Sequence, residues 1–439
     1  MSGSSMAPVG NSDSSPKAQE VMEYLTTHEL TQRLNDIVNN TVRARAPDPF
    51  AFIAEQFLAI AESPVVSHVA TCSALDDAGL FNSVNVHLFC RQSSSSYYIA
   101  SGRNFLNAPV SVDEGAIGTA ISNVLKSIPL KAENLSDTDR SLSEIKQDGS
   151  QFFIPAASAG FLKAIAQVVR QDPYSVLHNI LHPSCSDAIV MPTPLVDIVK
   201  SKNLKFNSFG MASTSKLSLR RYLQAVSFVC KEIKSKSIAG ASQILLVESK
   251  KPDDILTMLG QAITGAQITL GEQAVLWLDA GAGAMFNVET NDYEFNDGAC
   301  VSREELLALY QTMVAQHPSL AIIIDPFHID DRQGWTLFDS ALGKHVTALS
   351  STLSTVGIPS TVSFRTTVSD FIDISQGAKK TNPCFIASCS HNIRNDDIIV
   401  DLAIASGAKY CRFGPITGGT NAELYNRLLW IDNTTQTTK

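Results

Sequence analysis

The sequence predicts an α/β chain in which a helical hairpin precedes a small α+β part and then a barrel or open sheet of alternating strands and helices. Three observations lead to this prediction. Apolar residues recur at helical spacing between residues 20 and 62. Three runs that alternate like half-buried strands follow, and helical stretches come after them. Beyond residue 190, strand-like and helical runs alternate, which is typical of a mainly parallel sheet.

Composition places this chain of 439 residues among globular proteins, since 44% of its residues are apolar and 18% are charged. The net charge of −9 disfavours general binding to nucleic acid or to an anionic membrane surface. No apolar run reaches the length of a membrane span, and the first residues lack the features of a signal peptide. The eight cysteines form no CxxC pair, which is typical of reduced thiols. We therefore expect a cytoplasmic protein without nucleic-acid partners or membrane spans.

The N-terminal region predicts a tail and a hairpin. Residues 1–18 are rich in Ser, Gly, Pro and Asn, so we expect a disordered tail. Residues 19–62 predict two helices, and Asp48 and Pro49 are suited to cap and begin the second. Two short helices cannot bury an apolar face alone, so the hairpin either packs on the main body or forms a dimer. The predicted docking face consists of Leu30, Leu34, Ile37 and Val38 on the first helix and Phe50, Ile53 and Phe57 on the second.

The main body is expected to form two domains, at residues 63–188 and 189–433, with a short tail at 434–439. In the first domain we predict strands at 65–69, 83–90 and 97–100, and helices at 115–128, 141–146 and 157–180. In the second we predict strands at 243–247, 274–279, 320–325 and 384–388, alternating with helices at 252–264, 303–316, 338–356 and 398–406.

Several stretches, in the right order, resemble the enolases, which are lyases that convert 2-phosphoglycerate to phosphoenolpyruvate. They are Ala100-Ser101-Gly102 at the family's Pro-Ser-Gly loop, Pro192-Thr193-Pro194, Trp277 to Phe286, Ala321 to Trp335, and Tyr425 to Asp432. The resemblance extends from about Val65 to Asp432. It implies an enolase-like fold, in which an α+β domain precedes a degenerate and trimmed (β/α) TIM-like barrel.

The resemblance also implies that the family's metal site is incomplete. Enolases hold Mg²⁺ with three carboxylates, because this hard cation prefers oxygen ligands in octahedral geometry. The first carboxylate matches Asp279, but the second falls at Ile324 and the third near Ser363, and neither residue offers a carboxylate. We therefore expect no bound cofactor, although the family uses Mg²⁺.

The acid–base and phosphate-binding residues of the family are altered as well. Its catalytic Lys lies in a strand–helix stretch that we expect to be missing here. Two acidic catalytic positions match Asp254 and Ser208, and the final active-site Lys falls at Arg412, which keeps the charge but not the geometry. The phosphate-binding His-Arg-Ser is Cys389-Ser390-His391, so the Arg fork for phosphate is gone. The substrate contacts that the resemblance leaves are Ser101 and Arg412.

The hairpin resembles the dimerisation and docking module of the cAMP-dependent kinase regulatory subunit, which grips an amphipathic helix of an anchoring protein. A docking module before an eroded enolase resembles enolase-like proteins of sperm and other flagella. We therefore expect a catalytically inactive scaffold or adaptor of the ciliary or flagellar axoneme, which forms a homodimer and binds an amphipathic helix of an anchoring or axonemal protein. Two alternatives stay open: a divergent phosphopyruvate hydratase of glycolysis, and a module that senses phosphate ligands through Arg412 and Lys409.

Overall fold

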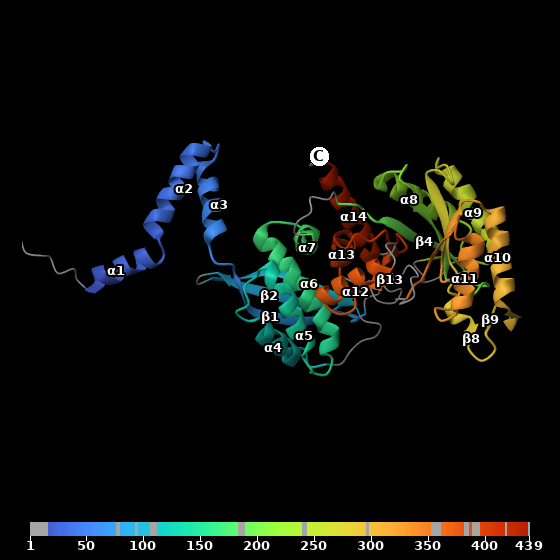
Figure 1. The fold of residues 1–439 in the computed structure, drawn as a ribbon, viewed down its shortest axis with the longest axis horizontal. Coiled ribbons are helices and arrows are strands. Elements are labelled where there is room, and N and C mark those ends of the chain that lie inside the picture. Colours follow the sequence, from blue (N-terminus) through green and yellow to red (C-terminus); the bar gives the residue numbers. More distant parts are fainter. Residues whose placement is uncertain are drawn as a thin grey trace, which may run out of the picture. The chain divides into compact units, whose positions relative to one another are not determined.

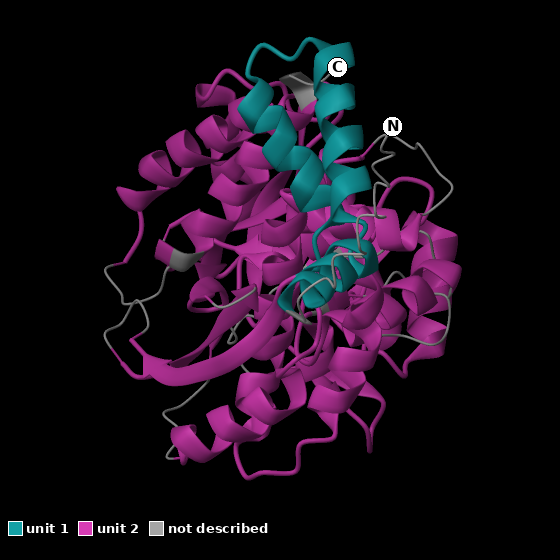
Figure 2. Ribbon diagram, turned by 90° about the vertical axis from the view of Figure 1, so that its left-hand side faces the viewer, with its two compact units in different colours: residues 1–63 teal, residues 64–439 magenta. Residues whose placement is uncertain are grey.

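The computed structural model describes residues 16–437 except for 76–79, 93–94, 106–111, 183–188, 239–243, 296–297, 353–360, 382–385, 389–395 and 418. The chain forms two compact units, residues 1–63 and 64–439 (Figure 2). The described part of the first unit consists of helices, whereas the second combines two larger sheets with helices (Figure 1).

The described helices of the first unit are α1 (Pro16–Thr27), α2 (Leu30–Ala44) and α3 (Pro49–Ile60). The first predicted helix is wrong as one element, because Glu29 adopts a left-handed backbone conformation (φ 50°) that separates α1 from α2. The expected tail is also too long, since α1 begins at Pro16.

The second predicted helix is confirmed by α3, together with its start signal. The Asp48 carboxylate accepts hydrogen bonds from the N–H groups of Phe50 and Ala51, at 3.0 Å each, and Pro49 takes the first helical position. These bonds satisfy amide groups that a helix leaves unpaired at its N-terminus. The turn between α2 and α3 is therefore fixed by local chemistry.

The second unit begins with an antiparallel sheet of β1 (Val65–Ala74), β2 (Ser83–Gln92) and β3 (Ser95–Phe105), in that order. The three strand predictions are confirmed, and each strand runs longer than predicted. Val84, Val86, Leu88 and Cys90 alternate along β2 and are fully buried, because this face of the sheet is covered by helices. The helices of this part are α4 (Glu114–Leu125), η1 (Ala132–Asn134), α5 (Leu135–Ser143), α6 (Ser150–Val169) and α7 (Pro173–Leu181).

Two helix predictions in this part are wrong in their limits. The helix expected at 141–146 is the end of α5, which already begins at Leu135. The helix expected at 157–180 is divided into α6 and α7, because Arg170 is left-handed (φ 53°) and Pro173 begins a new helix. α6 has the length and composition of a membrane span, but 67% of its most apolar stretch is buried within the protein, as in a core helix.

Gly102 allows α6 to lie directly against β3. A side chain at this position would overlap the carbonyl oxygen of Ala156 and approach Gly160, both on α6. Residues 100–102 therefore belong to a strand that packs closely on a helix, and not to the loop that the resemblance implies.

The larger sheet has nine strands in the order β12-β11-β7-β5-β4-β15-β14-β13, with β6 paired to β4 beside this path. β5 runs antiparallel to β4 and β7, and the other neighbours are parallel. These strands are β4 (Thr193–Ser201), β5 (Ser208–Ser213), β6 (Leu245–Val247), β7 (Ala274–Asp279), β11 (Leu320–Ile324), β12 (Thr347–Leu349), β13 (Thr361–Ser363), β14 (Ile386–Ser388) and β15 (Tyr410–Gly414).

Helices connect these strands along the sequence, as in βα units. The connecting helices are α8 (Leu219–Lys234), α9 (Pro252–Gly265), η2 (Ala282–Ala284), α10 (Arg303–Gln316), α11 (Arg332–Leu342), α12 (Val368–Thr381) and α13 (Ile398–Ala405), and α14 (Gly419–Thr437) follows the last strand. A small antiparallel sheet of β8 (Phe286–Asn287), β9 (Asp292–Glu294) and β10 (Cys300–Val301) follows β7.

The sheet curves toward a closed ring, since its last strand in sequence, β15, pairs with its first, β4. Among the described residues no strand pairing joins β12 to β13, but the Thr361 hydroxyl donates to the Ser350 carbonyl at 2.6 Å across this gap. A separate apolar cluster unites residues from six strands of the sheet, and it includes Trp277, Ile322 and Ile324. Side chains from many strands that meet in one cluster are typical of a filled barrel interior.

The predicted elements of this part are largely confirmed, and α10 has the predicted limits. The helix expected at 338–356 is wrong, because α11 ends at Leu342 and strand β12 follows. The tail expected to begin at residue 434 is wrong up to Thr437, because α14 extends to that residue. The hydroxyls of Thr434 and Thr435 donate to a carbonyl of this helix. In the described residues between β13, which carries Ser363, and β14, the chain has one helix, α12.

Candidate active site

Four buried polar side chains meet at one end of the larger sheet, and we refer to Asp197, Ser208, Asp279 and Arg412 as the Arg412 cluster. They come from four strands, β4, β5, β7 and β15, which are neighbours in the sheet. Asp279 is the last residue of β7, and Ser208, the first residue of antiparallel β5, lies opposite it in register. The carboxyl ends of parallel barrel strands carry the active sites of such folds. The cluster is therefore the candidate active site.

The Arg412 guanidinium joins the other three residues. Its Nη1 lies 2.7 Å from Asp279 Oδ2, and its Nη2 lies 2.7 Å from Asp197 Oδ1. Nε also donates to Asp197 Oδ2 at 3.2 Å, which makes the Asp197 contact bidentate. Ser208 Oγ accepts from Nη2 at 3.1 Å and donates to Asp197 Oδ1 at 2.5 Å. Arg412 thus bridges two carboxylates with the forked geometry that arginine favours.

Burial makes these contacts strong and keeps solvent out. None of the four residues is more than 4% exposed. The guanidinium carbon also lies 5.0 Å from the centre of the Trp277 ring, a distance at which a cation is attracted by an aromatic face. Burial alone would lower the pKa of Arg412, but Asp197 and Asp279 outweigh it and raise that pKa above the usual value. Arg412 is therefore a permanent cation at this position.

The described residues do not fit a Mg²⁺ site of the family's type. The side chain of Ile324 is fully buried in the apolar cluster, at the end of the strand next to β7 and in register with Asp279. The Asp279 carboxylate already contacts Arg412 and accepts from Asn207 Nδ2 at 3.1 Å. Across the described ranges, no three His, Cys, Asp or Glu side chains gather in a way that could hold a metal ion. A divalent cation beside the Arg412 guanidinium would also meet strong repulsion.

The strand order does not place Ser363, which the sequence matched to the third ligand, next to Ile324. Asp279 and Ile324 end neighbouring strands, and the next strand beside them is β12, which ends in Leu349. Ser363 belongs to β13, the strand at the other edge of the sheet path. The position that follows Ile324 around the barrel is therefore near Ser350. This serine supplies no carboxylate either.

Asp325, the residue after Ile324, is acidic, and its carboxylate holds a turn in place. It accepts hydrogen bonds from both the backbone N–H of Ser351, at 2.8 Å, and the Ser351 hydroxyl. Burial, followed by the nearby charge of Asp279, raises the pKa of Asp325. The Asp325 carboxylate therefore ties down the turn after β12.

The position expected for the catalytic lysine is also changed. The strand that follows β12 in sequence is β13, which reads Thr361-Val362-Ser363 and contains no lysine. Asp254, the expected partner acid, lies exposed in the first turn of α9 and accepts from Ser249 Oγ at 3.1 Å. Ser249, its hydrogen-bond partner, does not belong to the Arg412 cluster. The stretch Cys389-Ser390-His391 lies outside the described residues.

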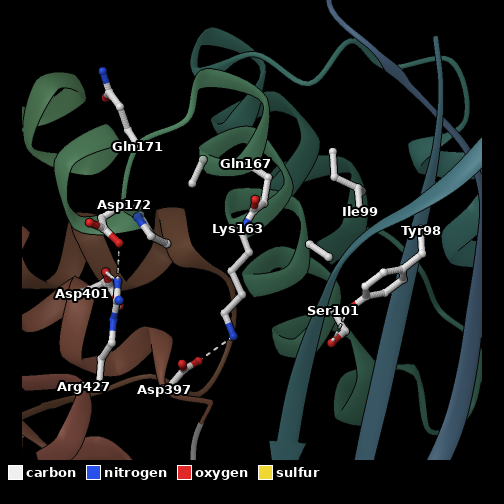
Figure 3. A pocket seen from close by; sticks show the side chains of 13 residues that line it. Tyr98, Ile99, Ser101, Lys163, Gln167, Gln171, Asp172, Asp397, Asp401 and Arg427 are labelled. Carbon is white, nitrogen blue, oxygen red and sulfur yellow. Dashed lines mark hydrogen bonds and ion pairs between the residues drawn. The ribbon is translucent and has the colours of Figure 1, made fainter. Parts of the chain in front are cut away.

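Ser101, the predicted substrate contact, lies elsewhere in the same unit. It lines a cavity of about 400 Å³ together with Lys163, Asp397 and Arg427 (Figure 3). The structure thus brings Ser208, Asp279 and Arg412 together and leaves Ser101 and Asp254 apart from them.

The predicted docking residues lie in the first unit and differ in exposure. Ile37 is 5% exposed because α3 covers it, and Leu30, Ile53 and Phe57 are half-buried. Leu34, Val38 and Phe50 are 45%, 51% and 81% exposed. An apolar surface therefore remains on this hairpin.

Sequence reasoning missed Asp197, which holds Arg412 from the opposite side. It stands in Pro194-Leu-Val-Asp-Ile-Val199, an apolar strand in which one charged residue is fully buried. A charge within such a run signals a buried partner, because burying an unpaired carboxylate is costly. The partner lies 215 positions away, so the sequence alone does not identify it.

Comparison with known proteins gives weak but extended similarities. No protein-family model matches the chain. Enolase 4 of Homo sapiens is 19% identical over an alignment that covers 94% of this chain and 87% of the human protein. Enolase 4 of Danio rerio is 21% identical over 64% of this chain, and Enolase of Aeropyrum pernix is 26% identical over 55%. The chain spans about half of the Danio rerio protein (53%) and 62% of the Aeropyrum pernix protein.

Proposed function

Because the chain is an enolase-like protein and a distant homologue of Enolase 4 across much of its length, we propose that it is a catalytically inactive scaffold or adaptor. The observation that carries the proposal is the Arg412 guanidinium, which contacts Asp279 and Asp197 at 2.7 Å each at the carboxyl end of the sheet. Enolase chemistry needs a metal ion to stabilise charge on the intermediate. In this chain the Arg412 guanidinium pairs with Asp279, the one carboxylate that matches the family's metal ligands.

Two further features support the proposal. Ile324 replaces a ligand with a buried apolar side chain, and β13 offers no lysine as a base. Loss of a positioned base alone typically costs roughly 10²–10⁴-fold in rate. A phosphate-sensing role is less favoured, because the Arg412 donors are directed at internal acceptors and the residue is 4% exposed.

The adaptor part of the proposal rests on the hairpin. The exposed side chains of Leu34, Val38 and Phe50 would each gain about 1.5–3 kcal/mol if fully buried. A four-helix dimer would cover such surfaces and leave a groove for an amphipathic helix. We propose that the occupant is a helix of an anchoring or axonemal protein, and that the chain resides in the cytoplasm and the ciliary or flagellar axoneme.

The test of inactivity is a turnover assay with the purified full chain, Mg²⁺ and 2-phosphoglycerate, beside an active enolase. We expect no formation of phosphoenolpyruvate. Ile324→Glu should also remain inactive, because groups that act as a unit are not restored one at a time. Mg²⁺-dependent turnover of even about 1 s⁻¹ that disappears in Asp279→Asn would overturn the proposal in favour of a divergent phosphopyruvate hydratase. Turnover that persists in Asp279→Asn would identify a contaminating enzyme.

A further inference from the structure

The cavity that Ser101 lines is separate from the Arg412 cluster, and we call it the seam cavity. It lies within the second unit, between β3, α6 and α7 on one side and the C-terminal helices on the other (Figure 3). Its polar lining includes Tyr98, Lys163, Asp172, Asp397 and Arg427. A volume of about 400 Å³ is within the range of small-molecule sites.

The two basic side chains of the cavity are already engaged by carboxylates. Lys163 Nζ lies 2.5 Å from Asp396 and 2.6 Å from Asp397. Arg427 contacts Asp401 at 2.6 Å and Asp172 at 3.2 Å. An anionic ligand would have to compete with these four carboxylates for two cations. The charge of the cavity is therefore unfavourable for phosphate or carboxylate ligands.

The four carboxylates differ in burial and in the hydrogen bonds that they already accept. Asp396 and Asp401 are nearly fully buried and also accept backbone N–H groups, from Arg103 at 2.7 Å and from Tyr174 at 3.0 Å. The side chains of Asp172 and Asp397 stay 30% and 47% exposed. The lone pairs that remain available thus belong to two carboxylates on the cavity wall.

The charges persist at neutral pH. Burial alone would raise the pKa of Asp397, but its hydrogen bond with Asp396 and the Lys163 charge outweigh it and lower that pKa. Burial would also lower the pKa of Lys163, and the two neighbouring aspartates reverse this and raise it. Burial raises the pKa of Asp396 and of Asp401, but four carboxylates against two cations still leave a surplus of negative charge.

The opposite wall supplies an aromatic ring and neutral polar groups. The Tyr98 side chain is 52% exposed, and its hydroxyl lies 3.2 Å from Ser101 Oγ (Figure 3). Gln167 and Gln171 of the α6 region add amide groups. An aromatic ring in a cavity lined by an excess of ion-paired but partly exposed carboxylates is suited to an ammonium group, which is attracted by both.

We propose that the seam cavity binds a small organic amine, with its ammonium group held by Asp172 or Asp397 and its body against Tyr98. Such a ligand adds the positive charge that the cavity lacks and shares Asp397 with Lys163 or Asp172 with Arg427. It contacts both β3 and the C-terminal helices, so it holds these two parts of the unit together.

Calorimetric titration of the full chain with butane-1,4-diamine tests the proposal, and butane-1,4-diol serves as the neutral ligand of the same shape. We expect saturable binding of the diamine and none of the diol. Asp397→Asn and Asp172→Asn should each weaken binding roughly tenfold, because each removes a charged hydrogen-bond partner. Asp330→Asn removes the same charge at an 87% exposed site and should leave binding unchanged.

Three results would overturn the proposal. One is the absence of diamine binding at millimolar concentration, and another is binding that neither cavity variant weakens, as expected of non-specific attraction to an acidic protein. The third is saturable binding of inorganic phosphate that competes with the diamine. Thermal melting of each variant checks folding, and Asp397, the more exposed of the two, provides an informative variant if Asp172→Asn fails to fold.

Discussion

The Arg412 guanidinium has a carboxylate on either side, 2.7 Å from Asp197 and 2.7 Å from Asp279, in a region almost closed to solvent. Charge balance explains the arrangement, because either carboxylate alone would be costly to bury. A metal ion would satisfy the same demand by a different route. Arg412 thus keeps two buried carboxylates paired at this end of the sheet.

We predict that Arg412→Met destabilises the chain by about 3–5 kcal/mol, since it leaves two buried carboxylates without a cation. Urea unfolding followed by circular dichroism measures this loss. The stability of Arg412→Lys should lie between that of Arg412→Met and that of the wild type, because lysine keeps the charge but cannot bridge both carboxylates with a planar fork. Arg332→Met, at an exposed position, is the matched control. An Arg412→Met protein as stable as this control would show that the ion pairs do not hold the barrel end together.

Asp139 provides a prediction about pH. This buried residue of α5 accepts from the backbone N–H and the hydroxyl of Ser369, at 2.9 and 2.7 Å. Burial raises the pKa of Asp139 from 3.8 to about 6. A carboxyl whose pKa is higher in the folded state contributes stability that is full below the unfolded pKa and is lost as pH rises through the folded pKa.

Replacement of Asp139 by Asn removes this titration. The wild type should lose stability as Asp139 ionises, and Asp139→Asn should not. The free energy of unfolding of Asp139→Asn, relative to that of the wild type, should therefore rise by about 2–3 kcal/mol from about pH 4 to about pH 7. Chemical denaturation across this range measures the difference. Asp137→Asn, whose carboxylate is 80% exposed, should show no such gain. A constant difference between Asp139→Asn and the wild type would contradict the prediction.

Individual residues were predictable where their chemistry is local. The role of Asp48 as a helix N-cap was predictable from its place before Pro49, and the structure confirms this role. The bond between Arg412 and Asp197 joins positions 215 apart, so only the folded sheet reveals it. The strand order, which puts β12 next to β11 and Ser363 on β13, is likewise seen only in the folded sheet, because a match by motif does not give it.

At the scale of elements, strong local signals were read correctly and short strands were not. The limits of α10 were predictable because Ser302 and Glu305 form a capping box before an apolar pattern. The three-residue strand β12 was predicted as helix, since so short a run shows no alternation. β4 and β5 were missed, although they carry Asp197 and Ser208.

The hairpin gives a prediction at this scale. Leu34→Glu places a charge on the exposed apolar face of α2, so we expect the dimer to become a monomer in sedimentation while the second unit still melts cooperatively. In cells the variant should leave the detergent-resistant cytoskeleton. Gln32→Glu, on the opposite side of the same helix, should change neither property. If Leu34→Glu stays dimeric and attached, the docking proposal should be abandoned.

At the scale of the whole molecule, the alternation of strands and helices predicted a barrel-like second half, and the mixed sheet agrees with this prediction. In the described residues between β13 and β14 the chain has one helix, α12, so strands and helices keep alternating to the end of the larger sheet. The mixed α/β architecture is consistent with an enolase-like fold.

We propose that the Arg412 guanidinium, 2.7 Å from Asp279, stands where a metal-dependent enolase would hold its divalent cation. Titration of the purified full chain with Mn²⁺, followed by electron paramagnetic resonance of the free ion, measures whether a divalent cation binds there. We expect no tight site in the wild type and no change in Asp279→Asn. Binding of one Mn²⁺ per chain at micromolar concentration, lost in Asp279→Asn and kept in Asp330→Asn, would contradict this proposal.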